Sequence, residues 1–249
     1  MELFSKVSTF IEKAKKVRRL DELDRLLEAT ADNLGFDFYA LGHHVDLQLP
    51  PENAVRLLNY PTAWFKRVLE RRYFVDDPIL LMSQRAVAGF RWSEVPDMMA
   101  LTARQKAILA QAPREGLGAG YTVPVHVPGE YAGSVNFAVR TERKLPEASL
   151  PSAQYVGTVA FEAARRFQLA SIGAAKEPPA PLSPRQRDCV ALVALGKSDK
   201  EIAQRLGIKP VTVKSYIEDA MAHHHTTRRT QLVVRALFQG DISFSDVIK

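Results

Sequence analysis

The chain has 249 residues, a charged fraction of 25%, a net charge of +6 at pH 7 and a sequence pI near 9.4. This basic excess is compatible with nucleic-acid binding without demonstrating it. The single cysteine, Cys189, excludes a disulfide framework, and no apolar run approaches the roughly 18 residues that a membrane span needs. We therefore expect a cytoplasmic protein without a membrane partner, long enough for two domains.

The first part of the chain predicts helices, then a strand, then more helices. Apolar residues recur at helical spacing over residues 2–16 and 20–34, where Asp21 is expected to cap the second helix and Gly35 to end it. Alternating aromatic and small residues predict a strand over residues 36–42. Pro61 marks the start of a helix that stops near residue 73. Asp77 and Pro78 begin the next helix, as N-cap and first-turn residue.

The following section predicts further strands and a long helix. A short strand over residues 88–92 and a helix over 102–111 precede two strands at 116–127 and 132–140, with Pro128 and Gly129 as a hairpin turn. Residues 152–170 form a long helix by their apolar spacing. The order predicts an α+β fold, in which residues 1–170 form an α-β-α sandwich suited to enclosing a small molecule.

Residues 171–181 contain three prolines and no periodicity, which predicts a semi-rigid linker. Residues 182–249 then form a small all-α domain. Ser183 and Pro184 begin its first helix and Gly196 ends it, Asp199 is expected to cap the second, and Pro210 begins the third. Val213 and Ile217 face inward on the third helix, and its outward face is polar: Thr212, Lys214, Tyr216 and Glu218. Two helices joined by a glycine turn, with an exposed polar face, predict a helix-turn-helix that binds DNA.

Nearly the whole chain resembles the LuxR family of acyl-homoserine-lactone quorum-sensing regulators. In the C-terminal half the resemblance lies in LSPRQ, GKSDKEIAQRLGI and TVK, which many other bacterial regulators share. In the N-terminal half it lies in YPTAW, the Asp77–Pro78 pair, Trp92 and GYTVPV at 120–125, which are more specific. The resemblance implies a homodimeric transcription factor whose effector is an acyl-homoserine lactone. It also implies that the protein needs no cofactor, since the lactone is an effector, and that the protein is not an enzyme.

The resemblance implies eight ligand-binding residues. The side chains of several of them match the polar groups of an acyl-homoserine lactone. The indole N–H of Trp64 suits the lactone carbonyl, an ionised Asp77 suits the amide N–H, and Tyr60 can donate to the acyl carbonyl. Asn136 is expected to make a second bond to that carbonyl, and Trp92 to pack on the lactone ring. The remaining three are Gly120, which permits a close approach, and Ala40 and Ile79, which are expected in the tail wall with His44 and Leu80. Ordinary core packing, or helix capping in the case of Asp77, is the alternative for each of them.

In the helix-turn-helix of residues 182–249, the family pattern implies that Lys214 and Glu218 face base edges in the major groove. Lys197, Lys200, Lys209 and Thr212, with Ser198, are expected on phosphates, which set affinity and salt dependence. A solvated surface is the alternative for any single lysine. The partners implied are double-stranded DNA with an inverted repeat, a second copy of the chain and RNA polymerase. The helix over 152–170 and the segment 228–238 are the expected dimer surfaces.

Three positions depart from the family pattern. Gln186 replaces a common glutamate, Val68 replaces a common tyrosine of the pocket, and His223 to His225 replace residues that include a core leucine at position 224. We expect no metal site, because consecutive histidines on a helix point in different directions. A regulator that senses another small molecule, or acts without one, stays open. A lactone hydrolase is disfavoured, because no G-x-S-x-G elbow and no HxxxH spacing occurs in the sequence.

Overall fold

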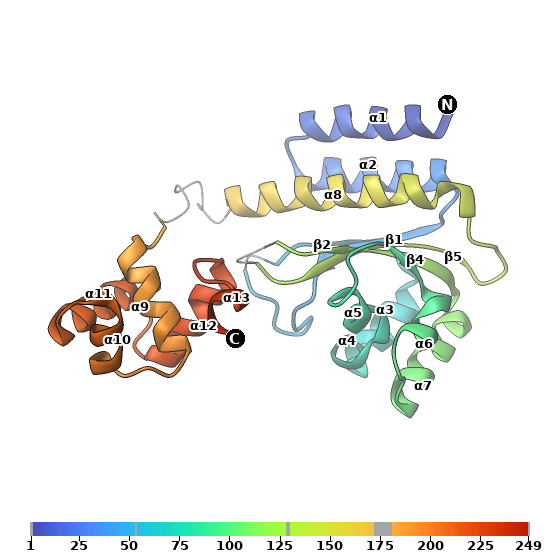
Figure 1. The fold of residues 1–249 in the computed structure, drawn as a ribbon. Coiled ribbons are helices and arrows are strands. Elements are labelled where there is room, and N and C mark those ends of the chain that lie inside the picture. The colour runs from blue at the N-terminus through green and yellow to red at the C-terminus, as the bar shows by residue number, and fades with distance from the viewer. Residues whose placement is uncertain (1, 53, 128–129, 172–180, 249) are drawn as a thin grey trace. The chain divides into compact units, whose positions relative to one another are not determined.

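The computed structural model of the chain describes residues 2–52, 54–127, 130–171 and 181–248. Contacts between residues divide these into two compact units, one containing the elements α1 to α8 and the other α9 to α13 (Figure 1). The predicted fold class is confirmed: an α+β unit comes first and an all-α unit second. The predicted linker lies almost wholly outside the described residues, and so does the turn at Pro128 and Gly129.

The first unit is built on an antiparallel sheet with the strand order β2-β1-β5-β4-β3. Its strands are β1 (Phe38–His43), β2 (Arg56–Leu58), β3 (Phe90–Arg91), β4 (Leu117–Val125) and β5 (Gly133–Arg140). Asn136 on β5 lies between Ala40 on β1 and Thr122 on β4, so these three residues form one row across the sheet. One strand repeat further along, Ser134 pairs with Gly42. Directly paired residues share a face, so both rows face the same side.

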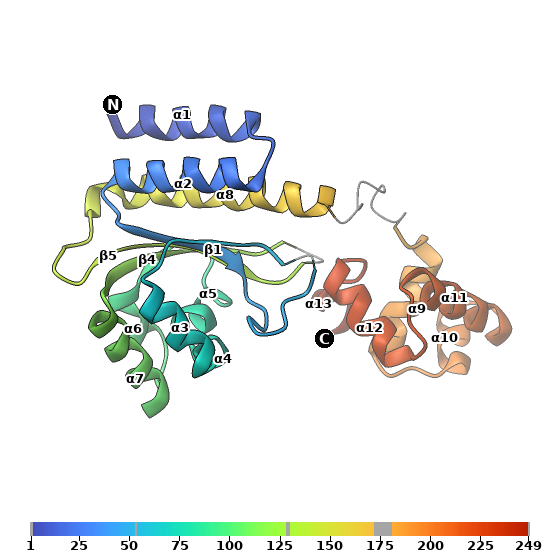
Figure 2. The same cartoon turned by 180° about the vertical axis from the view of Figure 1, so that it is seen from behind.

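Three helices cover one face of the sheet: α1 (Glu2–Lys16), α2 (Leu20–Leu34) and α8 (Leu150–Ser171) (Figures 1 and 2). Both α2 and α8 pack on the strands, and α1 packs on these two helices. The largest apolar cluster fills the layer between helices and sheet, with fully buried Phe10, Phe36, Phe137 and Phe161. Alternating buried positions along β1 explain why its pattern predicted a strand.

Short helices cover the other face (Figure 1). They are α3 (Thr62–Glu70), α4 (Tyr73–Asp76), α5 (Pro78–Ser83), α6 (Val95–Met98) and α7 (Ala103–Gln111), with 3-10 turns η1 (Trp92–Glu94), η2 (Ala112–Glu115) and η3 (Glu147–Ser149). Two smaller apolar clusters lie here, one around Trp64 and Ile108 and the other around Ile79 and Phe90. Because the helices are short and irregular, this side of the sheet leaves room for a cavity.

The second unit contains α9 (Pro184–Ala194), α10 (Asp199–Leu206), α11 (Pro210–His223), α12 (Arg229–Gln239) and α13 (Phe244–Val247). The bounds of the first three agree with the predicted helix-turn-helix. Ser183 caps α9, since its hydroxyl accepts from the backbone N–H of Gln186. The glycine after α10, Gly207, takes the left-handed conformation that ends a helix (φ 66°). Val213 and Ile217 are buried as predicted, at 0% and 4% exposure.

The structure corrects several local predictions. The residue before α2 is Arg19, and Asp21 lies in the first turn, where its carboxylate binds Arg19 and Arg25. Ser198, not Asp199, is the N-cap of α10, with its hydroxyl accepting from the backbone N–H of Glu201. The helix expected to run to residue 73 ends at Glu70, and α4 follows it separately. In the part of the chain that the structure describes, no helix is long and apolar enough to cross a membrane.

Candidate functional site

A cavity of about 140 Å³ lies between the sheet and the short helices. Strands β1, β2 and β5 contribute to one wall, and helices α3, α5 and α7 contribute to the other. The wall is mostly apolar, and polar side chains reach it at a few points, as is usual for small-molecule sites. The lining residues are Ala40, Leu41, Gly42, His43, His44, Val45, Leu47, Arg56, Leu58, Tyr60, Trp64, Phe65, Val68, Asp77, Ile79, Leu80, Trp92, Ile108, Leu109, Ala112, Leu117, Ser134 and Asn136.

Tyr60, Trp64 and Asp77 bring polar atoms to this wall. Tyr60 precedes α3, Trp64 lies in its first turn with 4% exposure, and Asp77 caps α5. Among the described residues, neither the hydroxyl of Tyr60 nor the indole N–H of Trp64 has a hydrogen-bond partner, and no basic side chain pairs with Asp77. The cavity therefore presents two donors and a carboxylate that a bound molecule would satisfy.

Burial governs the charge of Asp77. Desolvation raises the pKa of its carboxyl from 3.8 to about 6, although the backbone N–H groups of Ile79 and Leu80 oppose this rise. The hydrogen bond from the N–H of Ile79 to the carboxylate measures 2.9 Å. Burial, followed by the nearby charge of Asp77, also raises the pKa of Tyr60. At neutral pH, Asp77 is thus mainly an acceptor and Tyr60 keeps its proton as a donor.

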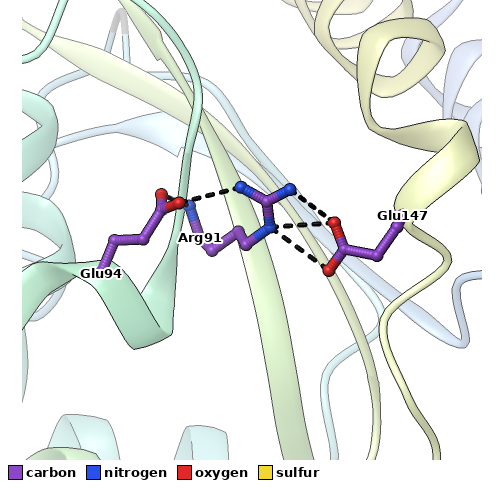
Figure 3. A network of polar contacts seen from close by, with 3 residues as sticks. All are labelled: Arg91, Glu94 and Glu147. Atoms are coloured by element: carbon purple, nitrogen blue, oxygen red, sulfur yellow. Dashed lines mark hydrogen bonds and ion pairs between the residues drawn. The ribbon is translucent and has the colours of Figure 1, made fainter.

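Two contacts fix the ring of Trp92 in place, and the residue before it is anchored as well. Its indole N–H donates to the hydroxyl of Thr122 at 2.8 Å. A Cβ atom at Gly120 would lie 2.4 Å from the ring, so only glycine lets the ring lie here. Just before it, Arg91 forms ion pairs with Glu94 and Glu147 and holds the end of β3 against the turn before α8 (Figure 3). The guanidinium lowers the pKa of Glu147.

Asn136 is engaged by the protein itself. Its amide oxygen accepts from Thr122 at 2.7 Å, and its amide nitrogen donates to the carbonyl of Ala40 and to the hydroxyl of Ser134, each at 3.2 Å. Both amide hydrogens therefore already have acceptors. The expected bond from Asn136 to a ligand carbonyl would have to replace one of them, and Asn136 is better suited to organising the wall.

The cavity brings together most of the residues that the sequence singled out. Of the eight predicted ligand residues, seven line it; Gly120 does not, and lies behind Trp92 instead. His44 and Leu80, the other two tail-wall candidates, also line it. Ser134 and Arg56, which also line the cavity, and Thr122, which bonds to both Trp92 and Asn136, were not predicted from the sequence. Their positions depend on strand pairings between segments far apart in the chain. Val68 lines the cavity with an apolar side chain, at 9% exposure.

The helix-turn-helix presents the predicted polar surface. Lys214 and Glu218 are both exposed on α11, and their charged ends lie 3.7 Å apart, one helical turn from each other. Lys200 and Lys209 are exposed as well. Lys197 lies 3.5 Å from Glu201, in the first turn of α10. Thr212 and Tyr216, which we expected on the outward face, are half-buried, and Tyr216 packs against the apolar core of the unit.

The histidine run does not behave as three equivalent residues. His225 is exposed and takes a left-handed conformation (φ 51°) just beyond α11. His224 is buried at 4% exposure, and its Nε2 lies 3.2 Å from a carboxylate oxygen of Asp241. Within the described part of the chain, the side-chain atoms of His223, His224 and Asp241 that could bind a metal ion all lie within 4.8 Å of one another. Asp241, rather than the third histidine, thus completes this group.

Comparison with protein families covers both units. The family model described as "Autoinducer binding domain" matches residues 19–164, and the one described as "Bacterial regulatory proteins, luxR family" matches residues 180–236. The first match spans the sheet and the cavity, and the second spans the helix-turn-helix.

Individual proteins align with both units in one chain. A putative HTH-type transcriptional regulator of Sinorhizobium fredii, y4qH, is 29% identical over 221 residues, covering 87% of this chain and 67% of its own. The transcriptional activator protein VanR of Vibrio anguillarum is 26% identical over 241 residues, covering 96% and 98%. The crystal structure of Escherichia coli SdiA is similar in fold, with a TM-score of 0.66 at 22% identity, covering 96% and 98%.

Proposed function

The chain belongs to the LuxR family of autoinducer-binding, quorum-sensing transcriptional regulators, and from that premise we propose that an acyl-homoserine lactone occupies its cavity and alters its binding to DNA. The observation that carries the proposal is the set of Tyr60, Trp64 and Asp77. These residues bring two donors without acceptors and one acceptor without a cation to a single apolar cavity. A lactone carbonyl, an amide N–H and an acyl carbonyl would satisfy all three.

Each polar atom of the lactone head has one partner in this proposal. Trp64 donates to the lactone carbonyl, Tyr60 donates to the acyl carbonyl, and Asp77 accepts from the amide N–H. The ring of Trp92 packs on the lactone ring, held there by Thr122 and by the absence of a side chain at Gly120. Asn136 supports this wall from within the sheet. Ala40 and Ile79, with Leu80, provide apolar contacts for the acyl tail.

The DNA-binding part of the proposal concerns α10 and α11. Lys214 and Glu218 are exposed and adjacent, so both can reach base edges when α11 enters the major groove. Lys197, Lys200, Lys209 and Thr212 then contact phosphates and make the affinity dependent on salt. The regulator would act in the cytoplasm, where bacterial DNA and RNA polymerase are found.

We also propose that the protein acts as a homodimer on an inverted-repeat site, since two-fold protein symmetry calls for two-fold site symmetry. Exposed apolar side chains on the two helices expected at the interface support this proposal. Tyr155 on α8 is 63% exposed, and Val234 and Phe238 on α12 are 66% and 39% exposed. A second copy of the chain would cover these groups, which are costly to leave in water.

Thermal unfolding with a panel of acyl-homoserine lactones tests the proposal. A ligand that binds only the folded state raises the melting temperature by an amount that grows with the logarithm of its concentration divided by its Kd. We expect at least one lactone to raise it, and its ring-opened acid to be less effective because the carboxylate adds a charge beside Asp77. If no lactone changes the melting temperature while another class of small molecule does, the chain senses a different effector.

A further inference from the structure

Two histidines and an aspartate of the second unit lie close together at the end of α11. His223 is the last residue of this helix, and His224 follows it directly. Asp241 comes from the turn after α12, where Gly240 ends the helix with a left-handed backbone (φ 78°). The atoms of the three side chains that could bind a metal ion lie within 4.8 Å of one another. The cluster therefore connects the end of α11 to the turn between α12 and α13.

The imidazole of His224 is the buried member of this cluster. Its side chain is 0% exposed, and neither ring nitrogen makes a well-aligned hydrogen bond to any described residue. Its Nε2 atom nevertheless lies 3.2 Å from a carboxylate oxygen of Asp241. Buried polar side chains in proteins nearly always have a partner, so this ring calls for an explanation. An ion held between Nε2 and the carboxylate would be such a partner.

The surroundings of His224 favour its neutral form. Burial lowers the pKa of this imidazole below its usual value. The carboxylate of Asp241 opposes the shift, while His223 adds to it. The smaller effects of Gln239 and Arg235 act in opposite directions, the first raising the pKa and the second lowering it. The ring is therefore mostly neutral at pH 7, and a neutral imidazole is the form that binds a metal ion.

Two of the three consecutive histidines converge, although side chains on a regular helix diverge by about 100° per residue. Because α11 ends at His223, the ring centroids of His223 and His224 lie only 4.9 Å apart. His225 is exposed, has a left-handed backbone, and is not part of the cluster. The expectation of no metal site considered the histidine run alone. Asp241, which is distant in the sequence, takes the place of the third histidine.

We propose that His223, His224 and Asp241 bind one divalent transition-metal ion, and that Zn²⁺ is the ion that suits them best. Imidazole nitrogens are good ligands for zinc and its neighbours, whereas Mg²⁺ and Ca²⁺ prefer oxygen ligands throughout. Two histidines and one carboxylate, with water in the fourth position, form a common set of zinc ligands. The site is independent of the lactone-binding function proposed above.

The spacing of two ligands already fits zinc, and the third requires a small movement. Ligand atoms about 2.1 Å from a tetrahedral ion lie about 3.4 Å from each other. Nε2 of His224 and the carboxylate oxygen of Asp241 are 3.2 Å apart. The ring of His223 has to approach them by at most about 1.4 Å. Both His223 and Asp241 are partly exposed, so the ring can turn and an ion can reach the buried nitrogen from their side.

The charges at this end of α11 favour a cation. Asp241 brings a carboxylate, and the last carbonyl groups of the helix bring partial negative charge. Arg235 is a nearby cation that opposes binding. A bound ion would join α11 to the turn after α12, so it would hold the C-terminal end of the helix that we propose to read DNA.

Titration of the full-length protein with zinc tests the proposal. Bound metal is first removed with a chelator, and calorimetry then measures the binding of ZnCl₂ and, separately, of MgCl₂ at neutral pH. We expect one Zn²⁺ per chain, no binding of Mg²⁺, and a melting temperature that rises with the zinc concentration. X-ray absorption at the zinc edge should show two imidazole ligands.

Three variants identify the ligands. Asp241→Asn removes the charge but keeps the shape of the side chain, and it should weaken zinc binding by about tenfold or more. His224→Leu places an apolar side chain at a buried position, so the variant should fold while its melting temperature no longer responds to zinc. His225→Ala is the matched control, because His225 is adjacent in sequence but lies outside the cluster. It should keep the wild-type affinity.

Three results would overturn the proposal. The first is the absence of saturable zinc binding. The second is an unchanged zinc affinity in both Asp241→Asn and His224→Leu, which would mean that zinc binds elsewhere on the chain. The third is a loss of affinity in His225→Ala as large as the loss in Asp241→Asn. None of them bears on the lactone, because the cavity belongs to the first unit and the cluster to the second.

Discussion

Replacing Asp77 by Asn should have opposite effects on the stability of the ligand-free protein and on its affinity for a lactone. Asparagine keeps a side-chain oxygen to cap α5 but removes the negative charge. Burial raises the pKa of Asp77 from 3.8 to about 6, so the folded chain binds its proton more tightly than the unfolded chain does. The ionised carboxylate therefore destabilises the ligand-free fold above pH 6, by about 3 kcal/mol at most.

The pH dependence has a definite sign. Between pH 4 and 6 the folded state binds more protons at this site than the unfolded state, so the contribution of Asp77 to stability decreases as the pH rises through this window. Asp77→Asn lacks this contribution. We expect urea unfolding to show the variant more stable than wild type by about 1–3 kcal/mol at pH 7.5, and the difference to become small near pH 4.

The affinity should change in the other direction. A hydrogen bond to a charged group contributes about 1.5–3 kcal/mol, so the variant should bind a lactone roughly 10- to 150-fold more weakly by calorimetry. Asp76→Asn is the matched control: Asp76 lies next in sequence but pairs with Arg104 at 2.6 Å and does not line the cavity. Equal lactone affinity in Asp77→Asn and wild type, with both proteins folded, would refute the assigned role of this carboxylate.

Four further substitutions test other parts of the account. Trp64→Phe removes the indole donor, and calorimetry should show lactone binding about tenfold weaker with little change in ligand-free stability. Gly120→Ala places a methyl group 2.4 Å from the ring of Trp92, so urea unfolding should show a loss of about 1–3 kcal/mol and lactone binding should also weaken. His224→Leu removes a histidine whose pKa burial lowers; since protonation then favours the unfolded chain, the wild type should lose stability from pH 7 to 5 and the variant should lose less. Lys214→Ala should lower discrimination at one base pair by about 1–3 kcal/mol in DNA-binding titrations, whereas a uniform loss across sequences would reassign this lysine to a phosphate.

Local signals in the sequence were sufficient for most helices. A capping residue followed by proline marks a helix start through interactions within one turn, and both Asp77–Pro78 and Ser183–Pro184 begin helices in the structure. The same reasoning failed by one residue at Asp199, because Ser198 beside it is an equally good cap and takes the position. Strand β2 escaped prediction because its three residues are too few to show an alternating pattern.

The polar organisation of the cavity wall was beyond sequence reasoning. Asn136 and Ala40 are 96 positions apart, and their contact depends on the register between β1 and β5. That register assigns the hydrogens of Asn136 to protein acceptors and brings Ser134 to His44. Sequence alone identified Asn136 as a polar residue near the site, but its acceptors come from strand pairing. Gly120 was likewise predicted to permit a close approach of backbone or ligand, but only the fold shows that the ring of Trp92 is what lies against it.

Mass spectrometry of the small molecule bound to the purified full-length protein tests the central claim most directly. The protein would be produced in cells supplied with a mixture of acyl-homoserine lactones. The bound molecule would then be extracted, identified by its mass and quantified. The account predicts an intact lactone at about one molecule per chain in wild type and a large loss in Asp77→Asn. Recovery of no lactone, or equal recovery from wild type and Asp77→Asn, would contradict it.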